Sequence, residues 1–229
     1  MGYAAIYDPD TDTDRWYTDA TCEAICHWVR PGDRVLELGC ATGRMTAGFV
    51  AAGATVLGVD REPAYLEVAT GRGLPGVELV LGDLSSCASE QPFDHVVLAN
   101  VIHEVADPIG VLVAAAEALA PAGLLHLSLQ NPSSLHRLVG IATGAMAALH
   151  EVSERGSRFG TNRIFDSMEL RGLGARAGLR DIHHEGIMIK PFPNDVLGSL
   201  DDETLRGFVA AGRLVPEFAA MNYLIFRRT

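Results

Sequence analysis

The sequence predicts an α/β fold in which a mostly parallel sheet carries helices on both faces. Three observations predict it. Short apolar segments alternate with segments of helical periodicity over the first 130 residues. The segment DHVVLAN is apolar almost throughout, as expected of a strand that is covered on both faces. The run RVLELG ends at a glycine and a helical segment follows it, which is typical of a strand–turn–helix unit with a right-handed crossover.

The predicted elements follow one another in a regular order. A helix over residues 16–30 ends before PGD, and the predicted strands are 34–39, 55–60, 77–83, 94–100 and 124–129. Helices lie between them, over 44–53, after Pro63, and after Asp107, which caps a helix that Pro108 begins. The inner stripe of that last helix is Ile109, Leu112, Val113, Ala116 and Leu119. Ligands of such sheets bind at the carboxyl ends of strands, where the strand order reverses.

Composition fits a single soluble domain. The 229 residues suit one substantial core, and the formal net charge of −11 weighs against a nucleic-acid backbone as partner. No apolar run reaches the ~20 residues that cross a bilayer. The N-terminus MGYAAIYDPDTDTD lacks the basic start and apolar core of an export signal. The four cysteines have no zinc-type spacing, so we expect reduced thiols in the cytoplasm; they are Cys22, Cys26, Cys40 and Cys87.

The loop GCATG, residues 39–43, differs from a dinucleotide-binding loop. That fingerprint is G-x-G-x-x-G, and its second glycine lets the backbone approach a pyrophosphate. Ala41 stands where the second glycine would be, and Glu37 lies two positions before the loop. A carboxylate there would repel a pyrophosphate, whereas it suits a ligand that carries an ammonium group and a sulfonium. The residues therefore disfavour a nicotinamide-dependent oxidoreductase.

The segment ELGCATG resembles motif I of the class I S-adenosylmethionine (SAM)-dependent methyltransferases, E/D-x-G-x-G-x-G, and departs from it at Ala41. The similarity covers residues 35–130, and AAMNYLIFRR is a candidate for its continuation in the last strand. This resemblance implies a Rossmann-like fold with a mostly parallel seven-stranded sheet. It also implies that SAM is the cofactor and that S-adenosylhomocysteine is the product.

The resemblance assigns roles to residues at family-like spacing. Asp60 would accept the two ribose hydroxyls, and Asp83 would accept the adenine amino group, with the Leu84 amide against the ring. Asn100 and Val101 would border the methionine part of the cofactor. The full predicted cofactor-binding set is Glu37, Gly39, Cys40, Ala41, Gly43, Asp60, Arg61, Asp83, Leu84, Asn100, Val101 and Tyr17.

Several of these residues have structural alternatives that the sequence leaves open. Glu37 and Asp60 could cap helices or pair with nearby arginines, and Asp83 could be a turn residue. Cys40 is interpreted as a small loop filler rather than a nucleophile. The eight histidines are scattered without an H-x-x-x-H or H-E-x-x-H pattern, so no metal site is predicted.

The predicted domain, residues 1–229, has four parts. Residues 1–30 form an N-terminal helical lid, 31–130 the SAM-binding core, 131–165 a helical cap insertion, and 166–229 the C-terminal part of the sheet. Three cap residues, His136, Arg137 and His150, are candidate substrate contacts. The alternative is that they lie on an exposed helix surface.

The predicted function is methyl transfer to a small-molecule acceptor, on oxygen in preference to nitrogen. A hydroxyl acceptor gains from a general base, and His103, three residues beyond Asn100, is the catalytic candidate. The alternative for His103 is a hydrogen bond to Glu104 or a cap of the next loop. The alternative function is a catalytically idle SAM-binding regulator or scaffold. Apart from the acceptor we expect no nucleic-acid or membrane partner, and the sequence predicts no oligomeric state.

Overall fold

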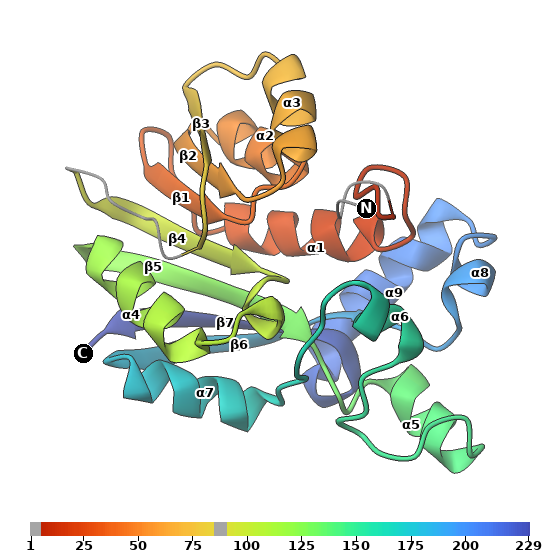
Figure 1. Ribbon diagram of the computed structural model, residues 1–229. Helices are drawn as coiled ribbons and strands as arrows, with labels where there is room; N and C mark the ends of the chain where they lie inside the picture. Colours follow the sequence, from red (N-terminus) through yellow and green to blue (C-terminus); the bar gives the residue numbers. More distant parts are fainter. Residues whose placement is uncertain (1–5, 85–90) are drawn as a thin grey trace.

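A twisted sheet forms the centre of the computed structural model, which describes residues 6–84 and 91–229 (Figure 1). Over these residues the strand order is β3-β2-β1-β4-β5-β7-β6. The strands are β1 (Arg34–Leu38), β2 (Thr55–Asp60), β3 (Val77–Leu81), β4 (Phe93–Ala99), β5 (Leu119–Gln130), β6 (Leu179–Ile189) and β7 (Ala219–Arg228). Strands β1 to β5 run parallel, and β7 is antiparallel to both of its neighbours. The predicted mostly parallel seven-stranded sheet is confirmed.

Helices connect the strands and flank the sheet. They are α1 (Arg15–Cys26), α2 (Arg44–Ala51), α3 (Pro63–Gly71), α4 (Pro108–Ala118), α5 (Leu135–Ala142), α6 (Glu154–Arg158), α7 (Ser167–Arg176), α8 (Asn194–Leu197) and α9 (Asp202–Leu214). Two short 3-10 helices are η2 (Ile102–Glu104) and η3 (Pro216–Phe218). No helix within the described parts of the chain has the length and apolar character to span a membrane.

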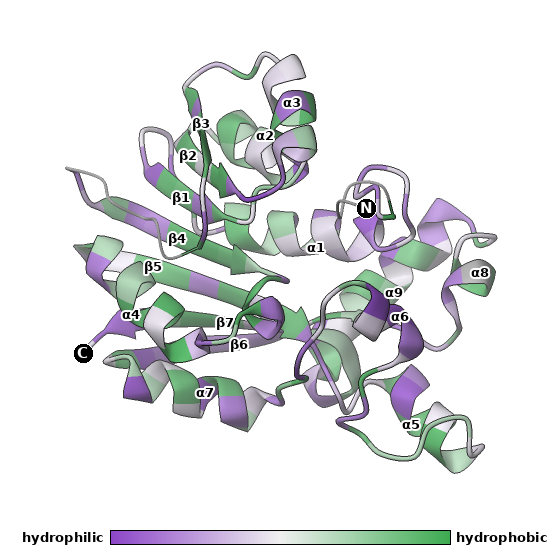
Figure 2. Cartoon of the chain, viewed as in Figure 1, coloured by the Kyte–Doolittle hydropathy of each residue, from purple (hydrophilic) through white to green (hydrophobic). Residues whose placement is uncertain are grey.

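The sheet separates two apolar cores. On one face, α1, α2 and α9 pack against side chains such as Val35, Val97 and Tyr223. On the other face, α4 and α7 pack against Leu36 and Leu38 among others. Figure 2 shows hydrophobic residues concentrated along β4 and β5, the central strands that both layers cover. Because side chains alternate along a strand, Glu37 of β1 faces the same side as Val35, toward α1.

Two predicted boundaries differ from the structure. The N-terminal helix ends at Cys26, and helix α4 ends at Ala118, where Leu119 turns to extended backbone and begins β5. The inner surface of α4 is therefore Val111, Leu112, Ala115 and Ala116, rather than the predicted stripe. Strand β5 passes through PAG, and its pairing with β4 is irregular between Phe93 and His95. Gly123 allows β5 to pass this close to β4, since a Cβ on Gly123 would lie 2.8 Å from the Phe93 carbonyl oxygen.

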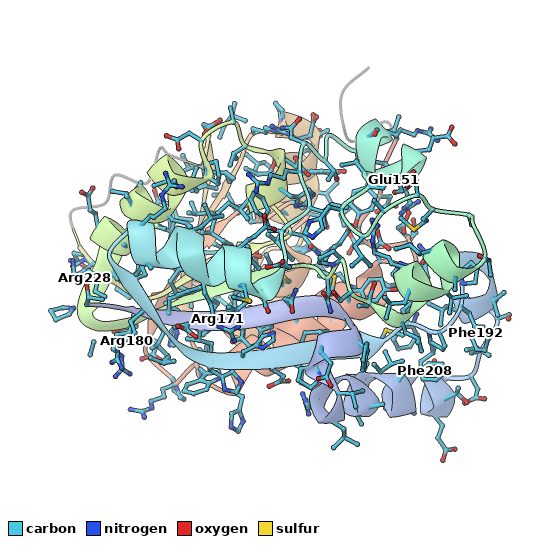
Figure 3. All side chains as sticks on the ribbon, turned by 90° about the horizontal axis from the view of Figure 1, so that it is seen from below. Glu151, Arg171, Arg180, Phe192, Phe208 and Arg228 are labelled. Atoms are coloured by element: carbon cyan, nitrogen blue, oxygen red, sulfur yellow. The ribbon has the colours of Figure 1, made fainter. Side chains whose placement is uncertain are left out.

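Residues 131–165, here called the cap segment, hold α5 and α6 between β5 and α7. Figure 3 shows Glu151 of this segment at the opposite end of the molecule from Arg180 and Arg228. Two contacts attach the segment to η2: the Asn162 backbone N–H donates to the His103 carbonyl at 3.0 Å, and the Asn162 side chain donates to the Glu104 carbonyl at 2.8 Å.

Candidate functional site

A cleft opens at the carboxyl ends of β1, β2 and β4. The strand order changes direction between β1 and β4, which is where ligands bind in such sheets. The volume of the cleft is about 1100 Å³ when the space open to solvent is included. Its walls come from the loop after β1, the loop after β2, the turn after β4, helix α1 and the N-terminal segment. The predicted site and the observed cleft therefore coincide.

The loop 39–43 is wound tightly around three residues with positive φ. Gly39 has φ 85°, Ala41 φ 45° and Gly43 φ 75°. A Cβ on Gly39 would collide with the side chain of Val101, which forms the opposite wall. The positive φ at Ala41 explains why the family pattern has a glycine at this position. A left-handed backbone conformation costs a non-glycine residue roughly 1–2 kcal/mol. Here the Ala41 N–H donates to the Asp60 carboxylate at 2.8 Å, which offsets that cost.

Asp60 holds two loops of the cleft with one carboxylate. Its Oδ2 accepts the Ala41 N–H, and its Oδ1 accepts the Glu62 N–H at 2.9 Å. Each oxygen has a second acceptor position, so the carboxylate can still bind two hydroxyl groups. Arg61 does not pair with Asp60; its guanidinium donates to Glu104 of η2 at 2.8 Å. That ion pair connects residues on two walls of the cleft.

Two further residues of the first loop region are buried in the cleft wall. Glu37 is 3% exposed and accepts a hydrogen bond from the Thr46 hydroxyl. Burial, with a smaller contribution from the Asp60 charge, raises the pKa of Glu37 to about 8. Burial also raises the pKa of the Cys40 thiol, so the thiol stays protonated at neutral pH. Cys40 fills the space beside Gly58, which fits the filler interpretation better than a nucleophile.

Four more of the predicted cofactor residues gather at the same cleft, whereas Gly43 and Tyr17 do not line it. Asp83, Leu84, Asn100 and Val101 all line it. Asn100 has φ 56°, and its backbone N–H donates to the Ser128 carbonyl at 2.9 Å. The Asn100 Oδ1 and the Ser128 Oγ are buried without a hydrogen-bond partner in the described structure. Such groups call for a polar ligand, because an unsatisfied buried group costs about 1–3 kcal/mol.

Tyr17 and His103 lie beside the cleft, outside its lining. The Tyr17 hydroxyl is buried without a partner within the described ranges, and Lys190 Nζ lies 5.9 Å from the centre of its ring. His103 is 8% exposed, and its Nε2 is 3.7 Å from Glu104 Oε1. A separate, smaller cavity borders His103 together with residues of the cap segment. Burial lowers the pKa of His103 to about 4, so its ring is neutral at pH 7.

The three candidate substrate residues of the cap segment do not line the main cleft. The Arg137 guanidinium donates to the carbonyls of Leu149 and Glu151, which makes it a brace within the segment. His150 contacts the Ile164 carbonyl through Nδ1 at 3.1 Å. His136 has a buried Nδ1 without a partner in residues 6–84 and 91–229, and burial lowers its pKa to about 3.

One cluster has metal-ligand side chains, namely His150, Asp166 and Glu169. Its carboxylates already have partners. Asp166 and Glu169 form the capping box of α7, and Glu169 also pairs with Arg163 at 2.8 Å. The cluster is therefore explained by helix capping.

Sequence reasoning missed several residues that line the cleft. Thr18 and Thr21 of α1 are the main ones, together with Pro9 of the N-terminal segment. Their signal was the i, i+3 spacing of two threonines next to the mostly apolar buried surface of α1. Ser128 could be found in the same way, as the polar residue at the end of an apolar strand.

The comparisons with known proteins agree with this geometry. The family model described as a methyltransferase domain matches residues 15–184. The chain belongs to this family and is a class I SAM-dependent methyltransferase.

Two curated relatives and one solved structure illustrate the similarity. The chain is 29% identical over 177 residues to a ubiquinone biosynthesis O-methyltransferase of Idiomarina loihiensis, covering 74% of this chain and 71% of that protein. It is 34% identical over 106 residues to one of Xanthomonas campestris, covering 44% of each, so it matches less than half of that relative. The structure of magnesium protoporphyrin IX methyltransferase from Synechocystis, with bound S-adenosylhomocysteine, shares the fold at 15% identity. Its TM-score is 0.65, with coverage of 95% of this chain and 86% of that one.

Proposed function

We propose that this protein transfers the methyl group of SAM to an oxygen atom of a small-molecule acceptor. The observation that carries the proposal is the cleft itself, where the loop 39–43, Asp60 and two unpartnered polar groups meet. The similarity to relatives named O-methyltransferases supports oxygen as the acceptor atom. We further propose that the protein works in the cytoplasm, and the net charge of −11 supports the absence of a nucleic-acid partner; we propose no membrane partner.

Different residues of the cleft would bind different parts of the cofactor. Asp60 would accept the ribose hydroxyls and Asp83 the adenine amino group, while the loop 39–43 and Asn100 would hold the methionine part. The sulfonium of SAM supplies both the electrophilic methyl group and a good leaving group. The chain's own contribution is to exclude water and to align the acceptor oxygen with the methyl group.

The position of the N-terminal segment beside the cleft supports a small acceptor. Tyr7 and Pro9 line the cleft, and the N-terminal segment is attached to both sides of it. Asp10 pairs with Arg72 of the segment after α3 at 2.7 Å, and Asp12 pairs with Arg155 of the cap segment at 2.8 Å. A macromolecular acceptor would have to displace these contacts.

A direct test compares acceptor atoms. Purified protein, SAM and either catechol or aniline are incubated, and S-adenosylhomocysteine and the methylated product are measured by mass spectrometry. We expect methylation of the catechol oxygen above a control in which Asp60 is replaced. Methylation of aniline alone would contradict oxygen specificity. Binding of SAM without turnover over a wide acceptor panel would favour the idle regulator or scaffold instead.

We infer that His103 is the general base that takes the proton of the acceptor hydroxyl group. Its neutral ring lies beneath the cap segment, next to Glu104, which lines the cleft. His103→Ala should lower turnover by about 10²–10⁴-fold while SAM affinity stays nearly unchanged. Because the neutral ring is the active form and its pKa is lowered to about 4, wild-type turnover should fall only near pH 4. His136→Ala is the matched control, because it removes another buried neutral imidazole. Unchanged turnover in His103→Ala would leave alignment as the whole contribution of the chain.

A further inference from the structure

Glu37 is an acidic side chain buried in a wall of the cleft, with no cationic side chain beside it in the described part of the chain. It is 3% exposed and lies on β1, where it faces α1 and α2. Among the described residues, its carboxyl group accepts a hydrogen bond from the neutral Thr46 hydroxyl of α2. In residues 6–84 and 91–229, no arginine or lysine contributes to the change in the pKa of Glu37. An ionised carboxylate without a partner is costly in such a place.

The groups around Glu37 add to this cost. Asp60 at the end of β2 lines the same cleft and carries a like charge. The nearby arginine of α2, Arg44, is already paired with Asp19 at 2.7 Å and with Asp10 at 3.3 Å. The remaining titratable neighbours are thiols, from α1 and from the loop after β1, namely Cys22, Cys26 and Cys40. None of these groups offers a positive charge to a Glu37 carboxylate.

We propose that Glu37 is a proton-linked receptor for the positive charge of the cofactor: it keeps a proton in the free protein and releases it when the cofactor binds. The inference rests on the assignment of SAM to this cleft. SAM carries an ammonium group and a sulfonium, and either charge would favour the ionised carboxyl once it lies nearby. The raised pKa of Glu37 in the free protein, with burial as its main cause, agrees with this assignment.

The consequence is a pH-dependent affinity. Below pH 8, cofactor binding has to remove the proton from Glu37, so the contribution of Glu37 to the affinity should rise with pH by up to about tenfold per pH unit and level off above pH 8. A second consequence concerns the free protein. Because the folded pKa of this acid is raised, its contribution to stability is complete at low pH and is lost as pH rises through about 8.

The test is calorimetric titration of the whole protein with SAM and with S-adenosylhomocysteine, in buffers of different ionisation enthalpy at pH 6 to 9. The matched variant is Glu37→Gln, which keeps the shape and can still accept the Thr46 hydroxyl. At pH 7 the wild type should release about one proton more per cofactor than Glu37→Gln does. The α-amino group of the ligand, with an ordinary pKa of about 7.7–8.0, is already mostly protonated at pH 7, so its own proton uptake on binding is small beside one proton in both proteins.

A second variant, Thr46→Val, guards against a folding defect in Glu37→Gln. Loss of the Thr46 hydroxyl removes the hydrogen bond that favours the ionised carboxyl, so the extra proton release should extend to higher pH. Equal proton release by wild type and Glu37→Gln, with both binding SAM, would overturn the proposal and leave the cofactor site intact. Absence of SAM binding by the folded wild type would overturn the cofactor assignment and the proposal together. A smaller release with S-adenosylhomocysteine than with SAM would identify the sulfonium as the charge that Glu37 senses.

Discussion

Replacement of Gly39 by alanine is expected to raise the Kd for SAM by at least about 100-fold, a loss of roughly 2.7 kcal/mol. Two effects act together at this residue. Its φ of 85° disfavours any side chain, and an added Cβ would collide with Val101, whose side chain forms the facing wall. Either the loop or the turn after β4 has to move, and both line the cleft. Calorimetric titration with SAM measures the effect.

Gly73 provides the matched control for this substitution. It has φ 60°, follows α3, and has no atom within 4 Å of an added Cβ. Gly73→Ala should therefore cost only the strain of a left-handed alanine, about 1 kcal/mol of unfolding free energy, with SAM affinity unchanged. If Gly39→Ala behaved like Gly73→Ala in both measurements, the close approach of the loop to Val101 would have no role in binding.

The order of strands and helices could be read from the sequence because each parallel strand is a short apolar run with a clear stop. Strand β1 stops at Gly39, and strand β2 stops at Asp60, which begins the next turn. The boundary between α4 and β5 could not be predicted in this way. Leu119 continues the helical apolar stripe, but its side chain packs in the core from an extended backbone instead. Tertiary packing decides such a residue, and local periodicity does not contain that information.

The candidate site was predictable to the extent that it depends on backbone turns. Residues at the ends of β1, β2 and β4 that the sequence predicts as cofactor ligands line the cleft, because parallel strands bring their carboxyl ends to one edge. Residues whose position depends on the rotation of a helix about its axis were harder to predict from the sequence. Tyr17 was expected at the cofactor, whereas the next residue, Thr18, lines the cleft. Arg137 was expected to be available for substrate, but the carbonyls of the cap segment occupy its donors.

Asp60→Ala is expected to have the second large effect, and it should weaken SAM binding by roughly 1.5–3 kcal/mol, the range for hydrogen bonds to a charged group. It should also destabilise the protein, because the N–H groups of Ala41 and Glu62 lose their acceptor. The two losses have to be separated, since Asp60 shapes the loop and is also the proposed ribose ligand. Asp60→Asn keeps one carbonyl oxygen and nearly the same volume, so it should restore part of the stability.

The ligand can separate the two roles of Asp60 more sharply than the second variant can. Titrations with S-adenosylhomocysteine and with its 2′-deoxy analogue, on wild type and on Asp60→Ala, form a double-mutant cycle. If the carboxylate accepts the 2′-hydroxyl, the wild type should prefer S-adenosylhomocysteine, and Asp60→Ala should lose most of that preference. If Asp60 acted only by holding Ala41 in its left-handed conformation, both ligands would lose affinity equally and the preference would persist. The coupling energy therefore reports the ribose contact itself, independently of how far the loop relaxes when its acceptor is removed.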